Sequence, residues 1–316
     1  MKLITAQQIN ALHISPKECV DWIRHSFMSK YEAQLPTKIS LHPQGNDFFN
    51  TMPCLLPPTY HRYGVKIVSR IQGAVPSLCS DILLYDSATG ELLAMLDGDW
   101  ITTMRTGAVA TVAMQTLRKS DAETYAFVGL GNTGRASLLC LLEAEPEQMH
   151  KVLLFRYKDQ AELFIERFSG YDNVEFTVVD DLEEMISKAD VIVSCITDAA
   201  SSLMCADNSK FKEGCLVIPV HTRGFQNCDL FFDKVFADDT GHVCGFKYFS
   251  QFKQFAELSE VLLGQKPGRE NDKERILSYN IGLGLHDVFF ANRIYTILAE
   301  DAEEIAVIRE NKKFWI

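Results

Sequence analysis

The segment 124-TYAFVGLGNTGRASLLCLLEAE-145 decides the fold of this chain, because it joins an apolar strand, a glycine-rich turn and a helical pattern. Its turn, 129-GLGNTG-134, matches G-x-G-x-x-G in the setting that a dinucleotide site requires. Gly129 turns the chain, Gly131 lets the backbone approach a pyrophosphate, and Gly134 allows close packing of the helix. Free N–H groups at the helix start favour phosphate. A glycine-rich turn without a ligand is the alternative, and the flanking strand and helix favour the dinucleotide.

Short apolar runs alternate with amphipathic ones after residue 120, which is typical of a parallel sheet covered by helices on both faces. Helical patterns span 132–145 and 158–168. The predicted strands are 124–130, 151–156, 174–180, 190–196, 215–220 and 234–238. This rhythm predicts an α/β fold with a Rossmann-type doubly wound sheet over residues 120–292.

Residues 1–119 have a different character, with strand-like segments separated by Gly, Pro and Ser turns. Segments 65–71 and 81–86 are predicted strands, and 86-DSATGELLAML-96 is predicted to form an antiparallel hairpin. The first part of the chain is therefore expected to be a separate α+β domain.

The composition of the 316-residue chain is that of an ordinary globular protein, with 47% hydrophobic and 23% charged residues. Its net charge of −11 argues against nucleic acid or an anionic membrane as a partner. No apolar run reaches the length of a membrane span, and no signal peptide is evident. Single, scattered cysteines and dispersed histidines predict a cytoplasmic protein without a metal site.

The end of the second predicted strand reads 154-LFRYKD-159. An NAD site usually presents Asp or Glu there, to bind the ribose hydroxyls. Arg156 and Lys158 suit a 2′-phosphate instead, so NADP(H) is slightly preferred over NAD(H). A solvated pair of cations that leaves NAD(H) usable is the alternative.

One arginine, Arg105, lies in a run of small, uncharged residues within 97-DGDWITTMRTGAVATVA-113. This composition predicts a helix that packs closely against other elements, and a buried guanidinium there needs an anion. The anion is either a nearby carboxylate, Asp97 or Asp99, or a bound carboxylate or phosphate. The segment by itself favours the ion pair.

Several motifs together resemble the ornithine cyclodeaminase/mu-crystallin family over nearly the whole chain. They are 64-GVK-66, 89-TGELLAMLDGDWITTMRTGA-108, 127-FVGLGNTG-134, 267-PGR-269 and 280-NIGLGLHD-287. The resemblance implies hydride exchange between a nicotinamide cofactor and the α-carbon of an amino acid or imine. It also implies that residues 1–119, joined by a returning C-terminal helix over 293–316, bind substrate and form a homodimer.

The resemblance implies functions for three cationic side chains. Arg105 matches the family arginine that meets the substrate carboxylate beside the cofactor, which reverses the interpretation from the segment alone. Lys66 matches the family lysine at the substrate, where burial would lower its pKa and let it relay protons. Lys38 stands where many members carry a carboxylate-binding arginine, and a plain surface lysine is the alternative.

Further ligand contacts follow from the same resemblance. Ile281 is expected near the substrate. The remaining residues expected at the cofactor are Ser77, Asn132, Thr133, Thr197, Val220 and Asn280.

The segment 217-VIPVHTRGF-225 departs from ornithine cyclodeaminase, because Arg223 stands where that enzyme has its catalytic aspartate. A cation there would repel the side-chain ammonium of ornithine and attract an acidic substrate. The favoured function is an NAD(P)(H)-dependent oxidoreductase acting on an amino acid, an imine or an opine-type conjugate. The alternatives are conversion of ornithine to proline plus ammonia, and a non-catalytic binding protein like mu-crystallin. Retention of Lys66 and Arg105 favours the oxidoreductase.

Overall fold

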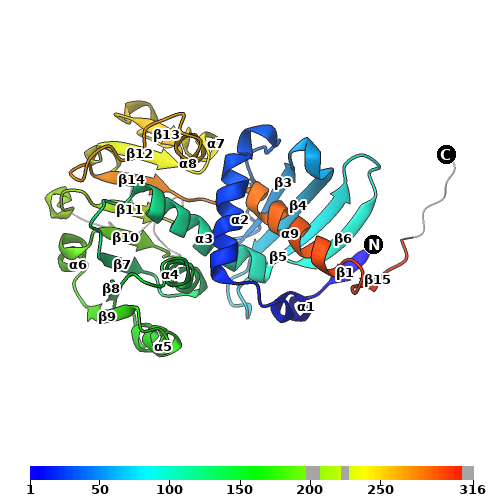
Figure 1. The fold of residues 1–316 in the computed structure, drawn as a ribbon, viewed down its shortest axis with the longest axis horizontal. Helices are drawn as coiled ribbons and strands as arrows, with labels where there is room; N and C mark the ends of the chain where they lie inside the picture. Colours follow the sequence, from blue (N-terminus) through cyan, green and yellow to red (C-terminus); the bar gives the residue numbers. More distant parts are fainter. Residues whose placement is uncertain (197–206, 222–227, 308–316) are drawn as a thin grey trace.

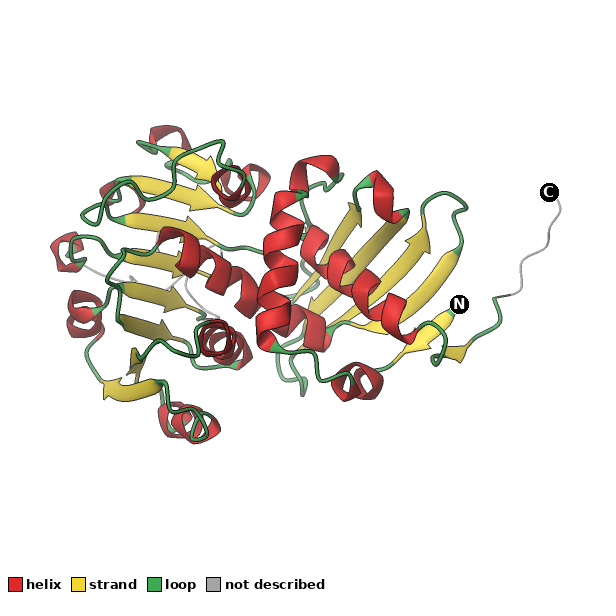
Figure 2. Cartoon of the chain, viewed as in Figure 1, coloured by secondary structure: helices red, strands yellow, loops and turns green. Residues whose placement is uncertain are grey.

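The computed structural model describes residues 1–196, 207–221 and 228–307, which form two lobes that are each built on one β-sheet (Figure 1). The strands up to Asp97 belong to the first sheet, and those from Thr124 to Tyr279 belong to the second. Helices fill the space between the two sheets (Figure 2). No helix among the described residues is both long enough and apolar enough to cross a membrane.

The second lobe confirms the predicted doubly wound sheet. Its strands are all parallel and stand in the order β13-β12-β14-β11-β10-β7-β8-β9. The strands are β7 Thr124–Val128, β8 His150–Phe155, β9 Val174–Val179, β10 Val191–Ser194, β11 Leu216–Pro219, β12 Lys234–Ala237, β13 Phe255–Glu257 and β14 Ile276–Tyr279. The predictions from sequence missed β13 and β14, which have three and four residues.

Helices on both faces explain why the central strands β7, β10 and β11 are largely apolar. The helices are α4 Asn132–Ala144, α5 Gln160–Arg167, α6 Leu182–Lys188, α7 Thr240–Val243 and α8 Leu258–Leu262. In β7, Tyr125 and Phe127 belong to one buried cluster, and Ala126 and Val128 belong to another. Successive residues therefore face opposite cores, as a doubly covered parallel sheet requires.

The first lobe contains a seven-stranded sheet in the order β15-β1-β6-β5-β4-β3-β2. Its strands are β1 Lys2–Ile4, β2 Ile39–Leu41, β3 Phe48–Leu55, β4 Arg62–Arg70, β5 Leu78–Asp86, β6 Leu92–Asp97 and β15 Glu303–Glu304. All neighbours are antiparallel except β1 and β6. The predicted hairpin is the β5–β6 connection, in which Gly90 adopts a φ of +74° that favours glycine.

The chain returns to the first lobe earlier than the sequence predicted. Helix α9 spans Gly284–Leu298 and packs on β3, β4 and β5, whereas the returning helix was expected at 293–316. Nearly every residue of its first half is buried, so no polar face marked it as a helix. Residues 308–316 lie outside the described part of the chain.

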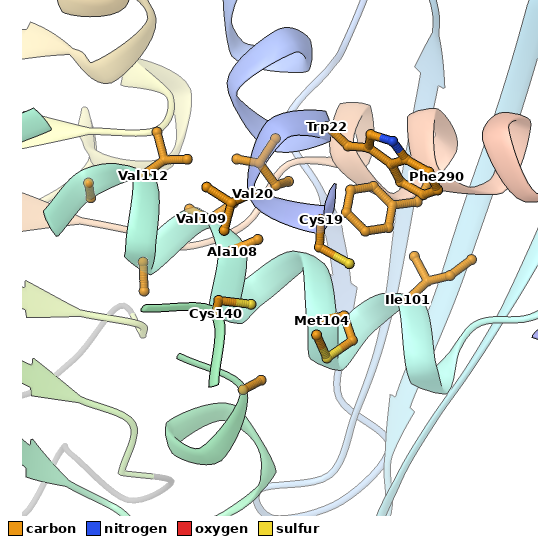
Figure 3. Close-up of a cluster of buried hydrophobic side chains, with 14 of the residues drawn as sticks. Cys19, Val20, Trp22, Ile101, Met104, Ala108, Val109, Val112, Cys140 and Phe290 are labelled. Atoms are coloured by element: carbon orange, nitrogen blue, oxygen red, sulfur yellow. The ribbon is translucent and has the colours of Figure 1, made fainter. Parts of the chain in front are cut away.

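Helix α3 (Asp99–Leu117) joins the lobes and is buried along most of its length. It packs against α2 (Pro16–Met28) and α4, whose side chains meet in one apolar cluster (Figure 3). Gly107 lies where α3 crosses α4, and a Cβ there would be 2.4 Å from the carbonyl carbon of Ala136. The small residues around Arg105 therefore allow close helix packing, as their composition predicted.

Candidate active site

The carboxyl ends of β7, β10, β11 and β14 form one edge of the second sheet, because these strands are parallel and adjacent. Backbone bonds continue beyond the strand ends. The amides of Cys195, Val220 and Asn280 each donate to the last carbonyl of a neighbouring strand, at 2.7, 2.9 and 3.0 Å. In a doubly wound sheet this edge receives the ligand.

The glycine loop has the geometry of a phosphate cradle. Gly129 has a φ of +88°, and a Cβ there would be 2.6 Å from the backbone of Cys195. A Cβ on Gly134 would be 2.5 Å from the carbonyl oxygen of Gly129, whereas one on Gly131 would meet nothing within 4 Å. Gly131 precedes α4 and offers no side-chain cap, so the N–H groups of the first turn, which begins at Asn132, are available to an anion.

Asn280 provides a second indication of a ligand at this edge. Its side chain is 2% exposed, yet neither the amide nitrogen nor the oxygen has a hydrogen-bond partner among the described residues. A buried, unpaired amide is costly and is often satisfied by a ligand. The open space at Gly131 and the unpaired amide of Asn280 together fit a dinucleotide lying along this edge.

Lys66 and Arg105 meet at one buried carboxylate, Asp287. Lys66 lies on β4, Arg105 on α3 and Asp287 on α9, so three elements of the first lobe supply the cluster. Oδ1 of Asp287 accepts from Nζ of Lys66 at 2.7 Å and from Nε of Arg105 at 2.9 Å. Lys66 and Asp287 are fully buried, and Arg105 is 6% exposed. Asp97 and Asp99 bond elsewhere, so the ion pair expected within the helix is wrong.

Burial and charge act together on the pKa values of this cluster. Burial lowers the pKa of Lys66 to about 7, Arg105 acts in the same direction, and Asp287 opposes both. Burial alone would raise the pKa of Asp287, but Arg105 and Lys66 outweigh it and hold that pKa below its usual value. The neighbouring His286 is buried, which lowers its pKa to about 3 and keeps it neutral.

The chain segment after Asn280 places the guanidinium of Arg105. Gly282 has a φ of +98°, and a Cβ there would be 2.3 Å from Nη1 of Arg105. The amide of Gly282 donates to Oδ2 of the buried Asp238, which fixes this turn against β12. The turn therefore joins the dinucleotide edge directly to the cationic cluster.

Lys38 lies beside the same cluster. Burial lowers its pKa, Asp238 opposes this effect, and Arg105 adds to it. Lys38 lines a small pocket together with Leu35, Pro36, Met52, Asp239, His242, Leu283 and Gly284. Among the described residues it has no ion pair within 4 Å. The alternative of an ordinary surface lysine is therefore disfavoured.

Arg156 and Lys158 lie just past the end of β8, as expected. Arg156 is paired with Asp180 through Nε and with Glu162 through Nη1, each at 2.6 Å. Lys158 adopts a φ of +51° and lies over the ring of Tyr157. The guanidinium of Arg156 is thus already bonded to two exposed carboxylates.

Comparison with known proteins now identifies the family. The sequence profile of the ornithine cyclodeaminase/mu-crystallin family matches residues 2–302. The chain belongs to this family. A Delta(1)-pyrroline-2-carboxylate reductase from Bacillus thuringiensis subsp. konkukian is 29% identical over 228 residues, which cover 68% of this chain and 69% of the relative. An N-((2S)-2-amino-2-carboxyethyl)-L-glutamate dehydrogenase from Staphylococcus aureus is 26% identical over 228 residues, covering 68% and 66%.

A solved structure shows the same architecture. It is that of the Thermococcus litoralis Delta(1)-pyrroline-2-carboxylate reductase in complex with NADH and L-proline. The TM-score is 0.84 at 25% sequence identity, and the match covers 96% of this chain and 100% of the other. The predicted fold class and family are therefore confirmed.

Apart from Arg156 and Lys158, the expected site residues divide into three groups. The structure brings Lys66, Arg105 and Lys38 together and places Gly129, Gly131, Asn132, Thr133, Gly134, Val220, Asn280 and Ile281 along the adjoining edge. Ser77 lies in the exposed turn between β4 and β5. Thr197 and Arg223 lie outside the described residues.

Three supporting residues were missed: Asp238, Gly282 and Asp287. The last two stand inside 280-NIGLGLHD-287, which the sequence marked only as a motif. The signal available was the need of a buried Arg105 for an anion, but nothing in the sequence said which carboxylate packs against it. Asp229, the first carboxylate after Arg223, is buried against the hydroxyl of Tyr279, and burial raises its pKa to about 6. The described residues contain no group of side chains suited to hold a metal ion.

Proposed function

We propose that this protein is an NAD(P)(H)-dependent oxidoreductase that exchanges a hydride with the α-carbon of an amino acid or imine. The observation that carries the proposal is the position of Lys66 and Arg105. Both donate to the buried carboxylate of Asp287. The turn at Gly282 links this carboxylate to the sheet edge where Gly131 and Asn280 would hold the dinucleotide. When bound there, the nicotinamide would donate or accept the hydride.

The charge of the cluster selects the substrate class. Lys66 and Arg105 carry two positive charges against the single negative charge of Asp287, and Lys38 adds a further cation nearby. Nη1 and Nη2 of Arg105 bond to no other described residue, so the planar fork is available to a carboxylate. A substrate carboxylate would neutralise the excess charge, as the α-carboxylate of an amino acid or cyclic imino acid does.

Lys66 supplies the proton in this proposal. An ammonium whose pKa lies near 7 is a suitable general acid at neutral pH. In the reductive direction Lys66 protonates the substrate nitrogen, and in the oxidative direction the neutral amine accepts that proton. Lys66 is fully buried, and Met52, its cross-strand partner on β3, lines the small pocket that also contains Lys38 and Leu283.

The test is turnover followed at 340 nm with NADPH and with NADH. The panel contains cyclic imino acids and 2-oxo acids with amines, and amino acids such as L-proline serve for the reverse reaction. We expect reduction of at least one imine that carries a carboxylate. Binding of dinucleotide without turnover of any panel member would favour the binding protein, and release of ammonia from ornithine with formation of proline would favour the cyclodeaminase.

We further propose that NADP(H) is preferred over NAD(H) through Arg156 and Lys158. The two ion pairs of Arg156 are exposed and contribute little to stability, so a 2′-phosphate can displace them. Arg156→Gln is expected to weaken NADPH binding roughly 10- to 100-fold and to change NADH binding little. Fluorescence titration measures both, with Lys151→Gln, at the far end of β8, as the control. Equal or tighter binding of NADH by the unaltered protein would remove the preference.

A homodimer in the cytoplasm is proposed as the working form. On β4, Gly64, Lys66 and Val68 are buried, while Tyr63 and Ile67 are 37% and 40% exposed, so the outer sheet face is apolar and uncovered in one chain. A second copy would cover it. No disulfide joins the cysteines of the described residues, which suits a reducing compartment.

The dimer is tested by changing that face. Ile67→Glu is expected to convert the dimer to a monomer at micromolar concentration, because it places a charge in an apolar interface. Light scattering gives the mass. Ile297→Glu is the matched control, since Ile297 is 51% exposed on α9. A monomeric unaltered protein would refute the proposal.

A further inference from the structure

Three groups on different elements converge on one oxygen atom. Oδ1 of Asp287 binds both Nζ of Lys66 and Nε of Arg105, while Oδ2 has no hydrogen-bond partner among the described residues. The side chain of Asp287 is fully buried, and its Oδ1 is shared by Lys66 and Arg105. We propose that Asp287 is a positioning residue that sets the charge and the direction of Lys66 and Arg105 for the reaction. This inference rests on the proposed function.

The contact with Arg105 fixes the direction of its guanidinium. Nε is held by Asp287, and Gly282 lies against Nη1, so the two terminal nitrogens are presented as a rigid fork. A guanidinium held at Nε has less freedom to lose when a carboxylate binds to its fork. Asp287 thereby orients the fork of Arg105 for a substrate carboxylate.

The ion pair with Asp287 favours the protonated form of Lys66, although Lys66 is fully buried. The charged groups that act on Lys66 are Arg105, Lys38 and Asp287, and only Asp287 favours the ammonium. His286 packs beside the cluster but is neutral, and Asp238 is engaged with Gly282 and His242. Without the carboxylate, burial and two cations would drive Lys66 to the neutral amine, which has no proton to give to an imine.

The test removes the negative charge of Asp287 and keeps the size and the acceptor oxygen of its side chain. In Asp287→Asn the amide oxygen still accepts from both donors, but the negative charge is lost. We expect the titration of Lys66, observed by NMR of ¹³Cε-labelled lysine with Lys66→Met for assignment, to move down by roughly 1–3 pH units. At pH 7 we expect kcat/KM for imine reduction to fall roughly 5- to 500-fold, because the ammonium fraction starts near one half and falls with this shift. Dinucleotide affinity should stay within about twofold, because Asp287 lies outside the glycine loop.

Two variants complete the design. Asp287→Glu restores the charge and is expected to return the titration of Lys66 towards that of the unaltered protein. Asp99→Asn is the matched control, since Asp99 binds the amide and hydroxyl of Ser80 and neither Lys66 nor Arg105. A folded Asp287→Asn protein whose Lys66 titrates as in the unaltered protein would overturn the proposal.

The remaining outcomes are also decisive. If Asp287→Asn does not fold, the double variant Lys66→Met/Asp287→Asn is expected to fold, because it removes one of the uncompensated cations together with the carboxylate. Failure of the double variant as well would make Asp287 a structural residue and overturn its assignment. The NMR titration needs no substrate, so absence of turnover in the unaltered protein would remove the proposed function without deciding the role of Asp287.

Discussion

The Lys66→Met protein is expected to reduce its imine substrate about a hundred- to ten-thousandfold more slowly than the unaltered protein, because it lacks the proposed general acid. Methionine keeps an unbranched apolar stem in the enclosed site. Asp287 is not left without a partner, because Arg105 still donates to it at 2.9 Å. Dinucleotide binding should be retained, since Lys66 lies on the first sheet and the glycine loop on the second.

The pH dependence of the unaltered protein tests the same role of Lys66. The proposal requires protonated Lys66 for reduction, and burial places its pKa near 7. Reduction should therefore be fastest below pH 7 and decline as the pH rises through that value, whereas oxidation should increase. In the Lys66→Met protein, the decline of the reduction rate around pH 7 should be absent. Lys119→Met is the control, because Lys119 is paired with Asp121 and Asp190 away from the site. A Lys66→Met protein with half the normal rate would exclude Lys66 as the acid.

The Gly107→Val protein is expected to lose more than about 3 kcal/mol of stability, and it is the most damaging single change that we predict outside the site. The Cβ of any residue at 107 would be 2.4 Å from the carbonyl carbon and 2.5 Å from the carbonyl oxygen of Ala136. These are backbone atoms of α4 and cannot rotate away, so α3 and α4 must separate. That movement would open the apolar cluster between the lobes shown in Figure 3.

Thermal unfolding measures the effect. Each kcal/mol lowers the melting temperature by roughly 2–4 °C in chains of about 150–250 residues, and by less in a chain of 316. Gly170→Val is the matched control. A Cβ at Gly170 would meet nothing within 4 Å, and its backbone is not in the left-handed region. Similar melting temperatures for the two variants would show that the helix crossing tolerates a side chain and that the packing argument is wrong.

Local sequence was sufficient for the features whose partners lie nearby in the chain. The strand, glycine turn and helix of 124–145 follow one another directly, and the structure has them as β7, the turn at Gly129 and α4. The β5–β6 hairpin is likewise closed by the turn at Gly90. Such elements are predictable because hydrophobic period and turn residues specify them without distant contacts.

Tertiary structure alone decided what neutralises Arg105. The segment itself offered Asp97 and Asp99, but Asp97 accepts from the amide of Asp99 and Asp99 accepts from the amide of Ser80. The partner, Asp287, is brought in by α9, which returns to the first lobe after the chain has built the whole second sheet. Composition showed that a buried guanidinium needed an anion. Only the packing of α9 on β4 and α3 determines which carboxylate comes within 3 Å, because ion pairing depends on distance in space and not on separation in sequence.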